Sequence, residues 1–139
     1  MISEEIKAVI EDFDLFDDWD QRYQYLVEIG ERLPAMAAAD KTDDNRVMEC
    51  MSLVHLAAHP DGGSPPRLHF TGDCDTAIIK GVVALLVQLY SGKTTAEIET
   101  TDAEALFEGL HLDEHLSPNR HVGVYAIVEK LRRQARAFA

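Results

Sequence analysis

The chain is poor in cysteine and in positive charge. Its 139 residues include only two cysteines, Cys50 and Cys74, which are too few for a disulfide framework. Thirteen basic residues stand against 25 acidic ones, so the formal net charge is -12. Nucleic acids and anionic membranes both attract clustered Lys and Arg, and we therefore expect neither as a partner.

The chain also lacks a hydrophobic run long enough to cross a bilayer. Its longest apolar stretch, Ala77 to Tyr90, is too short and contains Lys80 and Gln88. The first residues are acidic and lack the apolar segment of a signal peptide. Because 46% of the residues are hydrophobic, the sequence predicts a single folded domain over residues 1–139. We expect it in a reducing cytoplasm, where a free thiol persists.

Two amphipathic helices are predicted before residue 34. Ser3 is placed to cap the first, Asp17 or Asp18 to cap the second, and Gly30 to end the second. The apolar positions recur at helical spacing, namely Ile6, Val9, Ile10 and Phe13, then Trp19, Tyr23, Leu26 and Val27. These stripes are expected to face a common core.

Two strands are predicted in the middle of the chain. Residues from Val47 to Ala58 show a strand-like alternation, and Arg67 to Thr71 reads as a return strand. The segment 59–66 between them is dense in Gly and Pro. The two strands should therefore form an antiparallel hairpin with a long loop.

The hairpin brings the two cysteines to one end of the sheet. In an antiparallel pair the residue numbers of facing residues have a constant sum. If Ala58 faces Arg67, this sum is about 125, and Cys50 lies opposite Asp75. Cys74 is then its neighbour across the strands. We expect the segment 72–75 to end the return strand and Asp75 to cap the next helix, with control of the cysteine loop as its second role.

The second half of the chain reads as helices. Residues 77–90 are apolar nearly all round, which is typical of a helix buried inside a domain. Further helices are predicted to begin at the capping box Thr94–Glu97, at Thr101 or Asp102, and at Ser117-Pro118. The last helix should bury Val124, Val128, Leu131 and Ala135. The fold class is therefore α+β, a small antiparallel sheet packed on one face by helices.

Cys50 is the residue best suited to carry chemistry. The N-terminus of the buried helix should favour its thiolate, whereas Glu49, Asp73 and Asp75 should disfavour it. A free cysteine with a pKa of about 8.5 is mostly protonated at neutral pH, and only the thiolate attacks sulfur. A docking partner could supply the missing activation.

Four motifs in order give the chain a resemblance to a known family. They are Asn45-Arg46-Val47-x-x-Cys50-x-Ser52-x-Val54, Gly72-Asp73-x-Asp75-x-Ala77-Ile78-x-Lys80-Gly81, Tyr90-Ser91-Gly92-Lys93-Thr94 and His115-Leu116-Ser117-Pro118-x-Arg120. Together they resemble the SufE family, the sulfur acceptors of iron–sulfur cluster assembly. The resemblance covers almost the whole chain and implies a fold like that of the IscU-type scaffolds.

The resemblance implies a role for each partner. A SufS-like, pyridoxal-phosphate-dependent cysteine desulfurase would pass its persulfide sulfur to Cys50, and a SufB-type cluster scaffold would receive it. The chain itself would be a sulfur carrier and desulfurase activator rather than an enzyme, with no cofactor and no metal. Glu49 and Met51 stand where the family usually has Gly and Gln, and Cys74 where it usually has Ser.

The residues around Cys50 are expected to shape its loop or contact the partner. They are Glu49, Met51, Asp73, Asp75 and Arg120. For Arg120, a structural ion pair in the first turn of its helix is an equal alternative. Cys74 fits a small residue in a turn, with a resolving thiol as the sharper alternative.

Two other functions stay open from the sequence. The chain could activate a desulfurase allosterically without holding sulfur. It could also be a scaffold-like zinc protein, with Cys50, Cys74, an Asp and a His as ligands. His111 and His115 are four residues apart, but they do not form a known metal motif and fit surface or packing roles better.

Overall fold

The computed structural model describes residues 4–112 and 118–138, without the side chains of residues 5 and 118–120. Its elements, in chain order, are α1 (Glu4–Leu15), α2 (Trp19–Glu31), the 3-10 helices η1 (Ala38–Asp40) and η2 (Asp43–Asn45), β1 (Val54–Pro60), β2 (Arg67–Cys74), α3 (Ala77–Tyr90), β3 (Lys93–Thr94), α4 (Thr95–Thr100), α5 (Ala103–Gly109) and α7 (Pro118–Arg136). The predicted α+β class is confirmed. No helix within these described ranges has the length and hydrophobicity of a membrane span.

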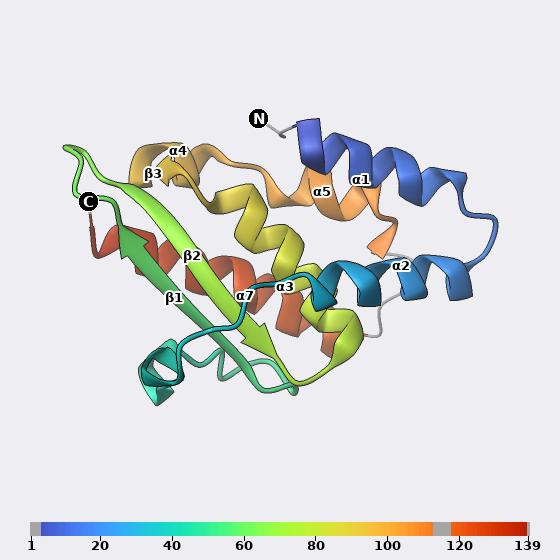
Figure 1. Ribbon diagram of the computed structural model, residues 1–139, viewed down its shortest axis with the longest axis horizontal. Coiled ribbons are helices and arrows are strands. Elements are labelled where there is room, and N and C mark those ends of the chain that lie inside the picture. The colour runs from blue at the N-terminus through green and yellow to red at the C-terminus, as the bar shows by residue number, and fades with distance from the viewer. Residues whose placement is uncertain (1–3, 113–117, 139) are drawn as a thin grey trace.

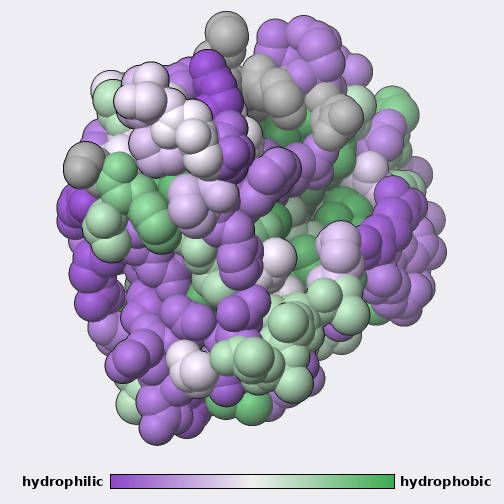
Figure 2. Space-filling model, turned by 60° about the vertical axis from the view of Figure 1, so that its left-hand side comes forward, coloured by the Kyte–Doolittle hydropathy of each residue, from purple (hydrophilic) through white to green (hydrophobic). Residues whose placement is uncertain are grey.

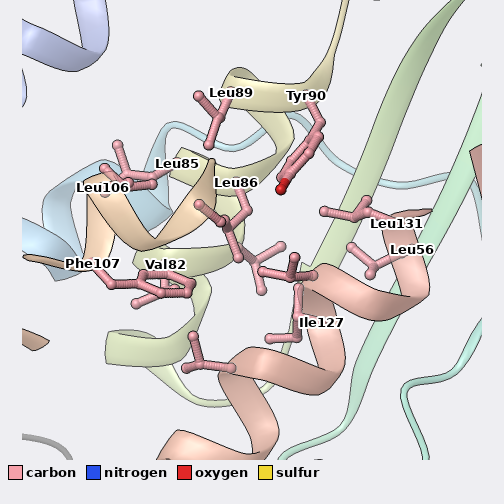
Figure 3. Close-up of a cluster of buried hydrophobic side chains, with 14 of the residues drawn as sticks. Leu56, Val82, Leu85, Leu86, Leu89, Tyr90, Leu106, Phe107, Ile127 and Leu131 are labelled. Carbon is pink, nitrogen blue, oxygen red and sulfur yellow. The ribbon is translucent and has the colours of Figure 1, made fainter. Parts of the chain in front are cut away.

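Helix α3 is the centre of the molecule. It packs on β2 and α7 on one side and on α2 and α1 on the other, while α7 also packs on β1 (Figure 1). Its side chains Val82, Leu85, Leu86 and Leu89 are at most 2% exposed, as a helix that is apolar all round requires. Figure 3 shows these side chains meeting residues from β1, α5 and α7 in one cluster.

Several helix ends follow local rules that the sequence predicts. The Asp18 carboxylate accepts a hydrogen bond from Gln21 N at 2.9 Å and caps α2. Thr94 and Glu97 form the predicted capping box at α4, and Asp102 caps α5. Ser3 and Ser117 lie outside the described residues.

The prediction that Gly30 ends α2 is wrong. The helix continues to Glu31, and Gly30 is buried where α2 crosses α3. A Cβ on Gly30 would lie 2.8 Å from Gly81 N, and one on Gly81 would overlap the Leu26 carbonyl oxygen. The two glycines therefore let the helix backbones approach each other.

The sheet has three antiparallel strands in the order β1-β2-β3. In the hairpin, Ala58 pairs with Phe70 rather than with Arg67, so paired numbers sum to 128. The register differs from the prediction because β1 continues to Pro60, which pairs with Leu68, and the loop between the strands is shorter than expected. At the other end of the hairpin, β2 does not break at Gly72 but continues to Cys74. Gly72 stays in the strand because it packs closely on α3, where a Cβ would lie 2.9 Å from Val83 Cγ1.

The face of the sheet turned away from α3 is partly covered as well. The chain between α2 and β1 runs along it, and η1 and η2 contact β1 (Figure 1). Met36 and Ala57 are buried but do not belong to the main core cluster. Lys41 pairs with Asp73 of β2 at 3.0 Å and fixes this connection to the sheet.

Candidate functional site

Cys50 lies in a tight loop just before β1, not in a strand. Residues 48–52 form turns, and β1 begins only at Val54. The loop is closed at its base by Val47, whose N–H donates to the Val54 carbonyl at 2.9 Å and whose own carbonyl accepts from Cys50 N at 3.2 Å. The strand therefore begins at Val54 and not at Val47, because the backbone turns back on itself between these residues, whereas the predicted strand from Val54 to Ala58 is confirmed.

The sulfur of Cys50 faces inward, toward α7. The residue is only 8% exposed and belongs to the core cluster. A Cβ added to Gly123 of α7 would lie 2.9 Å from Cys50 Sγ, so the missing side chain at position 123 makes the space for the thiol. Residue 51, directly beside it, is 84% exposed, so the thiol lies just beneath the surface rather than deep in the core.

Side chains at the start of α3 hold the loop in place. The Asp75 carboxylate oxygen Oδ1 accepts from Leu53 N at 2.9 Å, and the Asp75 N–H donates to the Leu53 carbonyl at 3.3 Å. Ser52 Oγ and Thr76 Oγ1 form a further hydrogen bond of 2.7 Å. We call these contacts the loop latch.

Asp75 does not cap α3, which corrects the prediction. The N-cap residue is Thr76, and its side chain makes no capping hydrogen bond. The carboxylate of Asp75 points to the loop instead, because β2 runs further than expected and turns Asp75 toward Leu53.

Cys74 is the second thiol at this end of the sheet, as predicted. It pairs with Val54 across the hairpin and is 6% exposed. Burial raises the pKa of Cys74 to about 11, and the negative charges of Asp75 and Asp73 add to the shift against a hydrogen bond from Thr76 N. Cys74 is therefore a neutral thiol at physiological pH, and both cysteines are free.

Asp73 lies on the opposite face of the sheet, away from the thiols. Its carboxylate pairs with Lys41 at 3.0 Å and with Lys80 at 3.7 Å. Burial opposes its ionisation, but the hydrogen bond and the charges of the two lysines prevail and lower the pKa of Asp73. Its contacts are those of a structural tie between segments.

The surface above Cys50 is unusually apolar. Met48 is 67% exposed, Met51 84% and Leu53 41%, and all three belong to the cysteine loop or follow it directly. Val122, next to Gly123, is 59% exposed. Glu49 points outward to Arg133 at 3.8 Å. Scattered apolar residues are normal on a protein surface, whereas several exposed on one loop make that loop a candidate interaction surface.

The described residues contain no group of three or more His, Cys, Asp or Glu that could hold a metal ion. His111 pairs with Asp14 at 3.1 Å, and His115 lies outside the described part of the chain. His55 is buried on the face of the sheet away from the thiols, since it pairs with Asp73. The backbone of Arg120 lies in the first turn of α7, but its side chain is outside the described part.

The sequence reading missed two residues of the site. Gly123 makes room for the sulfur, and Thr76 binds the loop through Ser52. A glycine inside a predicted helix costs stability and is itself a signal of a close contact, although it does not name the group that approaches.

Fold and site together define a class of protein: α+β, with a cysteine loop held between the central helix and the C-terminal helix at one end of the sheet. Comparison with known proteins agrees with this class. The family model "SufE: Fe-S metabolism associated domain" matches residues 7–135. A solved structure, the solution structure of a hypothetical protein from Thermus thermophilus, has the same fold, with a TM-score of 0.75, 22% identity and coverage of 99% of this chain and 97% of that one.

Two curated relatives are described as uncharacterized SufE-like proteins. One, from Rhizobium etli, is 39% identical over 135 residues, which are 96% of this chain and 91% of the relative. The other, from Rhizobium meliloti, is 37% identical over 131 residues, or 94% of each chain. The chain therefore belongs to the SufE family and has a role in iron–sulfur metabolism.

Proposed function

We propose that Cys50 accepts sulfur from the persulfide of a SufS-like cysteine desulfurase and passes it to a cluster scaffold of the SufB type. The observation that carries the proposal is the position of Cys50. It is a shielded thiol on a short loop, tied down by a few hydrogen bonds and topped by exposed apolar side chains. Membership of the SufE family supports the same role, which would be exercised in the cytoplasm.

The transfer is a thiol exchange that needs no external oxidant. The thiolate of Cys50 attacks the outer sulfur of the desulfurase persulfide, a new S–S bond forms, and the old one breaks. The desulfurase cysteine leaves as a thiolate, and Cys50 carries the persulfide. Draining the donor in this way would accelerate the desulfurase, and the same exchange in reverse would deliver sulfur to the next acceptor.

Cys50 is a better acceptor than Cys74. Attack requires the thiolate, and the pKa of Cys74, raised to about 11, keeps that residue protonated at neutral pH. Cys74 is also fixed within β2, where it pairs with Val54. Cys50 lies in a loop that can move as a unit once the loop latch opens.

The exposed methionines supply the contact that opens the loop. Met48 and Met51 flank Cys50 and are 67% and 84% exposed, so both are available to an apolar surface on the donor. Methionine is flexible and polarizable, which suits a surface that must adapt on docking. At rest, burial of the thiol protects it from oxidation, because susceptibility follows exposure.

Mass spectrometry tests the proposal directly. The chain would be incubated with a SufS-type desulfurase and free cysteine, then analysed without reductant. We expect a mass increase of one sulfur atom, located on the peptide that contains Cys50. The same experiment on Cys50→Ser should give no increase and should abolish stimulation of the desulfurase.

The matched control is Cys74→Ser, which removes the other buried thiol of the same sheet end. It should load sulfur as the unchanged chain does. Loading that persists in Cys50→Ser and disappears in Cys74→Ser would overturn the assignment. Stimulation that persists in Cys50→Ala without loading would show an allosteric activator instead.

A further inference from the structure

A second concave site lies on the other side of β2 from the loop latch. It is a groove of about 590 Å³ between α1, the end of α2, β2 and the second half of α3. Its floor consists of the apolar side chains Ile29, Phe70 and Leu85, which are 8%, 4% and 1% exposed. In Figure 2, hydrophobic residues gather in a hollow near the middle of the face, between hydrophilic rims. This size and lining are typical of sites for small molecules.

The described lining of the groove lacks the acidic residues that dominate the chain. Acidic residues outnumber basic ones by 25 to 13 overall, yet none of the fourteen described residues lining the groove is Asp or Glu. Arg32 lies at the rim, and its guanidinium forms no ion pair with any residue that the structure describes. An anionic group is the natural partner of such a guanidinium.

The polar groups beside the floor are donors as well. Ser91 Oγ accepts from Phe70 N at 3.0 Å, and its own hydroxyl proton can still be donated. His69 also lines the groove, in the strand that carries Phe70. The groove therefore offers an apolar floor with cationic and donor groups along one edge.

We propose that this groove binds a small amphipathic carboxylate. Its hydrocarbon part would lie on Ile29, Phe70 and Leu85, and its carboxylate would meet the guanidinium of Arg32. The site shares no lining residue with the cysteine loop or the loop latch. The proposal therefore does not depend on the acceptor role of Cys50.

A matched pair of probes tests the chemistry. The full chain, labelled with ¹⁵N, would be titrated with octanoate and with octylammonium, which have the same chain length and opposite charge. With octanoate we expect saturable amide shifts centred on residues 29–34, 69–71 and 84–91. Octylammonium should bind about tenfold more weakly, because it meets Arg32 with like charge.

A pair of arginine variants isolates the contact. Arg32→Gln should weaken octanoate binding about three- to tenfold, the worth of one partly exposed charged hydrogen bond. The control is Arg133→Gln, which removes an exposed positive charge on α7, away from the groove. It should leave octanoate binding unchanged. Equal binding of the two probes, shifts centred on the cysteine loop, or shifts that never saturate would each overturn the proposal.

Discussion

At the scale of single residues, the buried position of the Cys50 thiol depends on the absence of a side chain at position 123. The Cys50 sulfur occupies the space that a side chain of α7 would fill. Glycine inside a long helix costs roughly 1 kcal/mol relative to alanine, and here that cost gives the thiol a shielded place. The neighbouring thiol of Cys74 is buried as well, but its pKa of about 11 keeps it neutral.

Adding a methyl group at this position should push the cysteine loop outward. In Gly123→Ala the new Cβ would lie 2.9 Å from Cys50 Sγ, which destabilises the closed loop by about 1 kcal/mol. Alanine also stabilises the helix itself relative to glycine. This stabilisation is the same with the loop open or closed, so it does not change the free-energy difference between the two states. We expect iodoacetamide to alkylate Cys50 about fivefold faster, because the open population rises by that factor.

The measurement is best made in a Cys74→Ser background, where only one thiol reacts. Circular dichroism would establish that the variant is folded. An unchanged alkylation rate in a folded Gly123→Ala chain would contradict the proposed packing of the thiol.

At the scale of elements, the cysteine loop is held by the start of α3 rather than by its own turn. Asp75 and Thr76 lie at the point where β2 passes into α3, and both reach back to the loop. The junction is therefore linked by hydrogen bonds to Ser52 and Leu53, directly after Cys50 in the chain. Further along, α3 is held close to α2 at the crossing of Gly30 and Gly81.

The loop latch predicts different outcomes for two substitutions at one position. Asp75→Ala removes the acceptor for Leu53 N, a hydrogen bond worth about 1 kcal/mol, and should raise the alkylation rate of Cys50 about fivefold. Asp75→Asn keeps an amide oxygen in the same place and should change the rate little. Equal rates in the two variants would show that the hydrogen bond does not hold the loop.

At the scale of the whole molecule, Asp73 ties the connection between α2 and β1 to β2 and α3. Its carboxylate pairs with Lys41 of the connection from α2 to β1 and with Lys80 of α3. In a chain with a net charge of -12, such ties also offset the repulsion between acidic side chains. The connection covers the outer face of the sheet and is fixed there by this pair.

The tie predicts a pH-dependent part of the stability. The pKa of Asp73 lies below its ordinary value of 3.8, so its pairing stabilises the fold above that pH and is lost as the pH falls through the folded-state pKa. Asp73→Asn should lower the free energy of unfolding at pH 7 by less than about 1 kcal/mol, because the pair is partly exposed and screened.

Urea unfolding at pH 7 and near the acid end of the folded range measures this difference. The difference in the free energy of unfolding between the unchanged chain and Asp73→Asn should become smaller as the pH falls. Lys41→Gln, which removes the partner instead, should show the same narrowing. A gap that stays constant with pH would exclude the ion pair as its cause.

The sequence alone determined those features that depend on neighbours along the chain. Asp18, Thr94 with Glu97, and Asp102 cap their helices as expected, because a cap needs only residues within one turn. The apolar run from Ala77 to Tyr90 became the buried central helix. The four motifs, taken together in order and spacing, were sufficient to identify the family, which the family model and the curated relatives confirm.

Only the tertiary structure decided the features that depend on distant groups. The register of the hairpin, the turn of Asp75 toward Leu53 and the burial of Gly30 all follow from packing on α3. The Cys50 sulfur packs against Gly123, which is 73 positions away in the sequence. No local pattern specifies which elements meet, because that choice belongs to the free energy of the whole core.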